Sequence, residues 1–145
     1  MKVTYTKIDP SRVKENRAFY KTRVRTAFIR WCAYEGFFDG LLTEQEIRKA
    51  KKGQLPKDLN IHHRMPLSGK DEGVNEFSNL TVIHKDTHEY INRYVFAPQL
   101  KPHINDPYGT TFEIDIPEFD FVDTYGIKYE RQKKATTLRR NYHSR

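Results

Sequence analysis

Five polar side chains in the middle of the sequence have types and spacings that suit metal-assisted chemistry on a phosphate. They are the adjacent pair His62 and His63, followed by Asn79, His88 and Asn92. Neighbouring side chains of a strand point to opposite faces, so one histidine of the pair can bind a metal ion while the other reaches the substrate. His88 and Asn92 are four residues apart, a spacing that places two ligands on one helix face. Three protein ligands would leave metal positions open for water and a phosphate.

The residues around this group predict two strands and a helix. Segment 55–63 has the pattern of a turn leading into a short strand, and segment 80–83 alternates and is β-branched, as strands are. Between them, residues 68–78 are polar and contain glycine, which is typical of a loop. Helical spacing then begins at Lys85 and predicts a helix that ends before Pro98.

Two further helices are predicted before this central part. Apolar residues recur at steps of three, four and seven across 13–34, which predicts an amphipathic helix that Gly36 ends. Thr43 and Glu46 have the spacing of a capping box, so a second helix is expected to start there and to stop at Gly53.

The sequence of the C-terminal third predicts one strand and no further regular element. Residues 111–116 alternate between apolar and polar, and the segment beyond Gly126 is basic without apolar periodicity, so we expect a strand followed by a loosely ordered tail. The 145 residues suit one domain. Its expected parts are a helical part at 1–58, a central part at 59–97 and an extension at 98–145.

Composition excludes several classes of protein. A single cysteine, Cys32, rules out an internal disulfide and a zinc finger, and we expect it to be a small buried hydrophobe. No apolar run approaches the ~20 residues of a membrane span. The first nine residues lack the apolar stretch of a signal peptide, so the expected place of synthesis is the cytoplasm.

The net charge of +7 suits a polyanionic partner and is unevenly distributed. Residues 11–31 hold seven basic side chains against one acidic, and residues 131–145 hold six basic side chains and no acidic one. Residues 113–130 hold six acidic side chains against one basic. The basic segments are either solvated faces that pair with the acidic stretch or phosphate-binding surfaces.

Three runs of sequence together resemble the ββα-metal core of HNH endonucleases. They are Ile-His-His-Arg-Met-Pro-Leu-Ser-Gly at 61–69, Asn-Glu-Phe-Ser-Asn-Leu-Thr-Val-Ile at 75–83 and His-Glu-Tyr-Ile-Asn at 88–92. The resemblance is greatest to the toxin-type branch, which includes the colicin DNases and polymorphic-toxin nuclease domains. That branch places its last two ligands at the interval seen here, nine and thirteen residues after Asn79. The implied fold is α+β, with this core between N-terminal helices and a C-terminal strand plus basic tail.

The resemblance implies a role for each residue of the group. His62 would be the first metal ligand, and His63 would be the general base that takes a proton from the attacking water. Asn79 would hold the loop that aims His63, while His88 and Asn92 would complete the metal site. Neutral imidazole suits the role of base because its ordinary pKa lies near neutral pH.

The implied cofactor is one divalent metal ion. The colicin type has a histidine where this chain has Asn92, and an amide oxygen is a harder ligand, so Mg²⁺ or Mn²⁺ is favoured while Zn²⁺ and Ni²⁺ stay open. His84 and His88 are also four residues apart and offer a second ligand pairing, which the spacing from Asn79 disfavours. The basic residues next to the group are candidates for phosphate contacts or simple surface positions: Arg64, Lys85 and Arg93.

The expected function is therefore a metal-dependent endonuclease that hydrolyses DNA. Similarity to the toxin-type branch implies an antibacterial effector, delivered into target cells by a secretion system and neutralised by an acidic immunity protein. The alternatives are a phage or mobile-element nuclease, an RNase on the same frame, and a nucleic-acid-binding module without catalysis.

Overall fold

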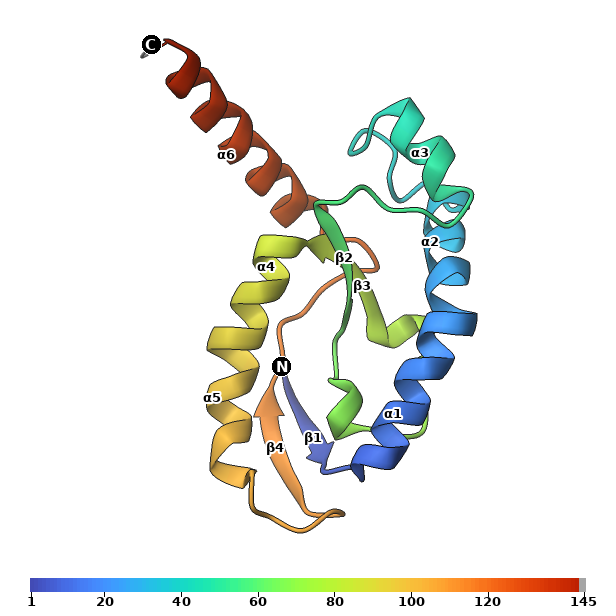
Figure 1. The fold of residues 1–145 in the computed structure, drawn as a ribbon, viewed down its shortest axis with the longest axis vertical. Helices are drawn as coiled ribbons and strands as arrows, with labels where there is room; N and C mark the ends of the chain where they lie inside the picture. Colours follow the sequence, from blue (N-terminus) through green and yellow to red (C-terminus); the bar gives the residue numbers. More distant parts are fainter. Residues whose placement is uncertain (144–145) are drawn as a thin grey trace.

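The computed structural model describes residues 1–143, with side chains through Thr136, and shows a mixed α and β fold with two small two-stranded sheets (Figure 1). This agrees with the expected α+β class. The strands are β1 (Lys2–Thr6), β2 (Leu59–His63), β3 (Leu80–His84) and β4 (Thr111–Asp115). The α-helices are α1 (Pro10–Phe19), α2 (Arg25–Tyr34), α3 (Glu44–Ala50), α4 (Lys85–Tyr90), α5 (Ala97–Leu100) and α6 (Thr124–His143). Two π-helical stretches, Tyr20–Val24 and Ile91–Phe96, and three short 3₁₀ turns, Leu67–Gly69, Phe77–Asn79 and Lys101–His103, complete the elements.

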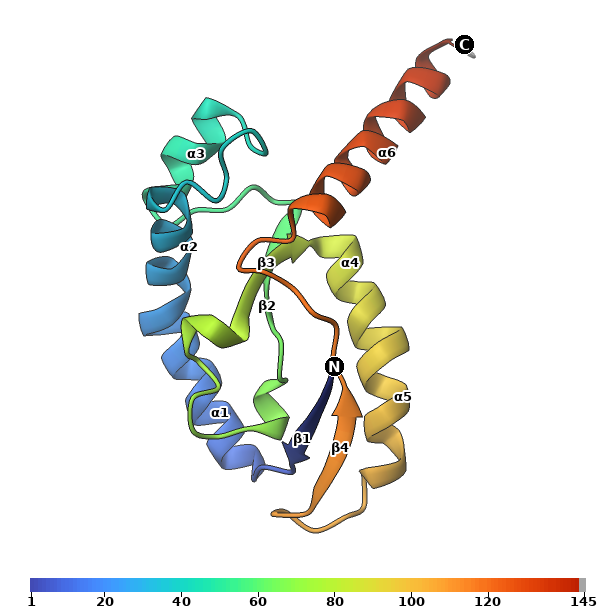
Figure 2. The same ribbon diagram turned by 180° about the vertical axis from the view of Figure 1, so that it is seen from behind.

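The central sheet consists of β2 and β3, which pair antiparallel with His62 opposite Thr81. Every residue of β3 is buried, and α4 begins directly after it. The sheet lies between two long helical segments, α1–α2 on one side and α4–α5 on the other (Figures 1 and 2). Because Leu59 lies opposite His84, the start of β2 lies beside the start of α4, and the α4–α5 segment continues from there along the sheet.

The larger hydrophobic core lies between α2 and the central sheet. Phe28 and Ile29 of α2 are fully buried, as are Leu80 and Val82 of β3. Cys32 belongs to the same core, and burial raises the pKa of its thiol to about 12. The expectation that Cys32 is a buried hydrophobe is confirmed.

The two predicted N-terminal helices are present. The first runs from Pro10 to Tyr34 with a π-helical interruption, and Gly36 follows it at φ +80°. Thr43 and Glu46 form both hydrogen bonds of the capping box, as predicted. The helix that they open ends at Ala50, and the chain turns through Gly53 at φ +89°.

The description of residues 1–58 as helical was wrong at its start, where β1 pairs antiparallel with β4. Lys2 lies opposite Asp115, and Tyr5, opposite Phe112, is 5% exposed. The strand at 111–116 that the alternation predicts is confirmed as β4. Its partner is more than 100 residues away, and five residues give too short a pattern to reveal that pairing from the sequence.

The predicted end of the central helix before Pro98 was also wrong, because helical structure continues to Leu100. The stretch Ile91–Phe96 is π-helical, and α5 starts afterwards at Ala97. Pro98 therefore falls in the first turn of a new helical segment, where a missing backbone N–H breaks no bond.

The predicted loose tail was a further error, because the chain beyond Gly126 continues as α6 to His143. Ile127 is fully buried and holds the start of this helix against β3. Of the tail's arginines, Arg139 and Arg140 have no described side chain, and Arg145 lies outside the described residues. Across residues 1–143, no helix is both long and apolar enough to cross a membrane.

Arg131 fixes α6 to the rest of the molecule through two carboxylates. Its guanidinium donates two hydrogen bonds to Glu46 at 3.0 Å and two to Asp58 at 2.9 and 3.0 Å. Its partners lie on α3 and just before β2, outside the acidic stretch 113–130, so this arginine does not make the expected pairing with that stretch. Paired bidentate contacts of this kind orient the guanidinium firmly.

Replacing Arg131 by alanine is expected to destabilise the fold by about 2 kcal/mol, which corresponds to a melting temperature lower by about 4–8 °C. The Arg131 hydrogen bonds are the main cause that lowers the pKa of Glu46 below its ordinary 4.5, so their contribution is present above that pH and is lost in acid. Thermal melts at neutral pH and near pH 3 measure both effects, with the exposed Arg48→Ala as the matched control. Equal melting temperatures for Arg131→Ala and wild type at neutral pH would contradict this account.

Candidate functional site

His62 and His63, the last two residues of β2, both line a pocket of about 320 Å³ beside the α4–α5 segment. The His62 side chain is 1% exposed, with its ring 5.4 Å from that of His88 and 5.6 Å from that of Phe96. Its Nε2 atom is buried without a hydrogen-bond partner among the described residues. A buried unpaired imidazole nitrogen is costly in a folded protein, and binding an ion would satisfy it.

His88 and Asn92 line the same pocket from the helical side. The Asn60 amide group lies 3.2 Å from His88 Nδ1 and holds the ring from β2. Asn92 is exposed, so its amide is free to turn toward a ligand. The structure thus brings His62, His88 and Asn92 together, the three residues expected to bind metal.

Asn79 does not line the pocket but fastens the loop that follows His63. Its Oδ1 accepts the backbone N–H of Met65 at 2.9 Å, and its Nδ2 donates to the carbonyls of Met65 at 3.1 Å and Val74 at 2.8 Å. Its own carbonyl accepts the N–H of Arg64 at 2.8 Å. With every polar atom of this 9% exposed side chain bonded, Asn79 ties the chain on both sides of the loop together.

Burial keeps the three histidines of the pocket uncharged at neutral pH. It lowers the pKa of His62 to about 3, and repulsion by Arg64 and by His88 and His63 in their protonated forms acts in the same direction. Burial also lowers the pKa of His63 and that of His88. Neutral imidazole carries the lone pair that a metal ligand or a general base needs.

The three predicted phosphate-contact residues do not lie together. Lys85 and Arg93 are exposed and line a hollow adjoining the pocket, which shares His88 and Asn92 with it. Arg64 instead donates to Thr81 Oγ1 at 3.1 Å and lines a separate hollow beside β1. The structure therefore brings Lys85 and Arg93 to the site and leaves Arg64 outside it.

The N-terminal helix contributes residues that the sequence analysis did not single out. Arg17 lines the pocket with an exposed side chain, and the ring of Tyr20 packs edge-on against that of His63 at 4.7 Å. In the sequence, the only feature of Arg17 that indicates a role in the site is its place on the basic face of the first helix. Asn75, which lies within the quoted HNH-like run, is hydrogen-bonded to His63 Nε2 at 2.9 Å.

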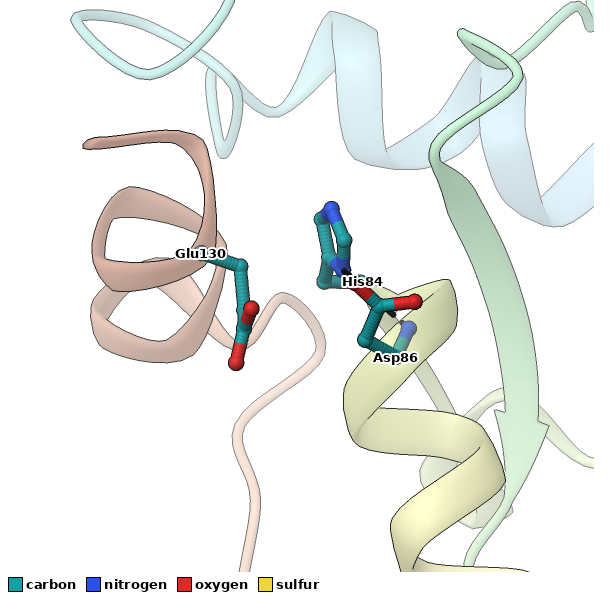
Figure 3. Close-up of side chains that lie close together, drawn as sticks. All are labelled: His84, Asp86 and Glu130. Atoms are coloured by element: carbon teal, nitrogen blue, oxygen red, sulfur yellow. Dashed lines mark hydrogen bonds and ion pairs between the residues drawn. The ribbon is translucent and has the colours of Figure 1, made fainter. Parts of the chain in front are cut away.

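His84 belongs to a different cluster and does not line the pocket, so the structure gives no support to an ion shared with His88. Figure 3 shows His84 beside Asp86, with Glu130 reaching toward them from α6. Among the described residues these three form a group that could hold a metal ion. His84 Nδ1, however, accepts the backbone N–H of Asp86 at 3.1 Å and caps α4, so this nitrogen already has a structural role.

Comparison with known proteins gives one relative. The chain is 24% identical over 91 residues to a protein of Escherichia coli described as "Uncharacterized protein YhhZ". The match covers 63% of this chain and 23% of YhhZ, so the chain spans less than a quarter of that relative's length. No family model and no solved structure matches the chain.

Proposed function

We propose that this protein is a metal-dependent endonuclease that hydrolyses phosphodiester bonds of DNA, built on an HNH-like ββα-metal core. The observation that carries the proposal is the gathering of His62, His63, His88 and Asn92 around one pocket. The elements that present them are two antiparallel strands followed directly by a helix. This is the order of elements that the resemblance implies.

The donor atoms of the pocket fit a divalent metal ion. His62 offers a buried nitrogen without a partner among the described residues, His88 offers a second neutral imidazole, and Asn92 offers an amide oxygen. Two nitrogens and one oxygen are compatible with first-row divalent metals, and the amide favours Mn²⁺ or Mg²⁺ over Zn²⁺ or Ni²⁺. When bound, the ion would stabilise negative charge on the phosphate oxygens and on the leaving oxygen.

His63 would act as the general base. Its imidazole would take a proton from a water molecule as the water oxygen forms a bond to phosphorus, and the bond from phosphorus to the 3′ oxygen would break. The leaving oxygen would take its proton from solvent. Asn79 supports this step from outside the pocket because it fixes the loop that follows His63.

Exposed basic residues on both sides of the pocket suit a nucleic-acid backbone. Arg17 lies on the α1 side, and Lys85 and Arg93 lie on the α4 side. Contacts of this kind bind phosphates without regard to base sequence, and they weaken as salt rises. Because water is the nucleophile, the reaction does not need a 2′-hydroxyl group, and DNA is the favoured substrate.

The proposal predicts cleavage of a labelled DNA duplex in Mn²⁺ or Mg²⁺, and no cleavage in excess EDTA. The assay compares a DNA duplex with an RNA of the same sequence, under each of Mg²⁺, Mn²⁺, Zn²⁺ and Ni²⁺. Cleavage of RNA alone would replace DNA by RNA as the substrate. Binding of DNA with no cleavage under any metal would favour a nucleic-acid-binding module instead.

A further inference from the structure

A chain of hydrogen bonds links His63 to the N-terminal helix. His63 Nε2 lies 2.9 Å from Oδ1 of Asn75, and Nδ2 of Asn75 donates to the backbone carbonyl of Asn16 at 2.9 Å. The Asn16 side chain in turn donates to Asp71 at 2.9 Å, and Arg12 holds the same carboxylate at 2.8 Å. All of these groups lie outside the metal-ligand set.

The chemistry of these partners determines the orientation of the Asn75 amide. A backbone carbonyl only accepts hydrogen bonds, so the NH₂ end of Asn75 must face Asn16. The oxygen of Asn75 then faces His63, and because this oxygen also only accepts, Nε2 of His63 must carry the proton. In a neutral imidazole this leaves the lone pair on Nδ1.

The Asn16 carbonyl can take part in both a helix bond and a bond to Asn75 because a carbonyl oxygen has two lone pairs. Within the helix it accepts the N–H of Tyr20, which is shared with the carbonyl of Arg17. The Asn16 carbonyl therefore has capacity to accept from Asn75. Asn16 is 8% exposed, so few waters compete for that bond.

We propose that Asn75 is a positioning residue that selects the Nε2-protonated tautomer of His63 and so directs Nδ1 toward the attacking water. The role given to Nδ1 rests on the proposed endonuclease function, whereas the tautomer itself does not. The N-terminal helix is then part of the site, because its Asn16 carbonyl orients Asn75.

The tautomer is measured directly by ¹⁵N NMR of the imidazole nitrogens in the metal-free protein without DNA, at about pH 8, where unperturbed histidine is neutral. His63→Ala identifies the His63 signals by their loss. In the wild type, Nε2 is expected to carry the proton. In Asn75→Ala, the ratio of the two tautomers is expected to fall about five- to tenfold, the size of one lost hydrogen bond.

Asn75→Asp retains an acceptor oxygen toward Nε2 and removes the donor to Asn16, so it is expected to keep the wild-type tautomer. Asn105→Ala, at an exposed asparagine, is the matched control. A wild-type His63 protonated mainly on Nδ1, or an unchanged ratio in Asn75→Ala, would overturn the proposal. Since the NMR measurement needs neither metal nor DNA, it decides the proposal even if the protein cleaves no nucleic acid.

If the wild type cleaves DNA, Asn75→Ala is expected to lower kcat about tenfold with little change in KM, because Asn75 does not line the pocket. A purely structural role would instead lower the melting temperature and leave the tautomer ratio of the folded fraction unchanged. A rise in KM at constant kcat would likewise contradict a positioning role.

Discussion

Replacing His63 by alanine is expected to slow DNA cleavage by about 10²–10⁴-fold, the usual contribution of a general base. The variant should still bind metal and DNA, because His63 is not in the proposed ligand set and the exposed cations around the pocket are unchanged. The rate is measured under single-turnover conditions in saturating metal, so that substrate binding and product release do not mask the chemical step.

The control for this variant is His103→Ala. His103 lies outside the pocket, with its ring stacked on Phe112 and its Nδ1 2.7 Å from an Asp106 oxygen, so its removal tests a histidine that has no contact with the proposed site. Its cleavage rate is expected to equal that of the wild type. Wild-type cleavage by His63→Ala would exclude His63 as the base.

Removing a metal ligand is expected to weaken metal binding about as strongly as removing His63 slows cleavage. Replacing His62 or His88 by alanine should weaken binding of Mn²⁺ by about 100-fold or more, measured by calorimetry on the protein without DNA. His62→Ala breaks no hydrogen bond of Nε2 but removes a buried ring, so a thermal melt of the metal-free variant establishes that it is folded before its affinity is compared. His88→Ala, at a half-buried position on α4, provides a second test of the same site.

The second cluster of potential ligands supplies the control. His84→Ala removes the histidine of the group formed with Asp86 and Glu130 and should leave Mn²⁺ affinity unchanged, although the loss of its cap and of its fully buried ring lowers stability. Loss of Mn²⁺ binding in His84→Ala, with binding retained in His62→Ala and His88→Ala, would move the metal to that cluster.

Metal binding should also raise the thermal stability of the protein. An ion that binds the folded protein at 100 times its dissociation constant stabilises it by about 2.7 kcal/mol, and the melting temperature rises accordingly. Wild type and His84→Ala should show this rise, whereas His62→Ala should not. Thermal melts with and without Mn²⁺ therefore test the same ligand set as calorimetry, and they do not require any cleavage.

The central part of the molecule follows from local sequence patterns. The alternation of β3 and the helical spacing after Lys85 are short-range signals, and both elements form where expected. The spacing of His88 and Asn92 is likewise local, and the two residues do line one pocket with His62. Local sequence patterns are therefore sufficient to predict that His62, His88 and Asn92 lie close together.

The other elements of the fold and the other residues of the site depend on contacts between segments that are distant in sequence. Strand β1 forms against β4, and α6 is held through Arg131 by carboxylates 73 and 85 residues away. Arg17 and Asn75 join the site because α1 packs beside the loop that follows β2, which no short window of sequence contains. Arg64 lines a different hollow for the converse reason, since adjacency to His63 in sequence does not place its side chain in the same pocket.

The expected toxin role and the acidic immunity partner come from the resemblance to toxin-type HNH nucleases and stay predictions. Neither determines the chemistry of the pocket. The basic residues beside it, Arg17, Lys85 and Arg93, would serve a phage or mobile-element nuclease equally well. The biochemical activity is therefore the property of this protein to test first.

The most direct test is the conversion of supercoiled plasmid to nicked or linear DNA by the purified wild-type protein, in Mn²⁺ or Mg²⁺ and in excess EDTA, beside His63→Ala. The expected result is conversion with metal, none in EDTA, and little or none by the variant. Intact plasmid under every metal tested, or equal cleavage with and without EDTA, would contradict the claim that this pocket is a metal-dependent nuclease centre.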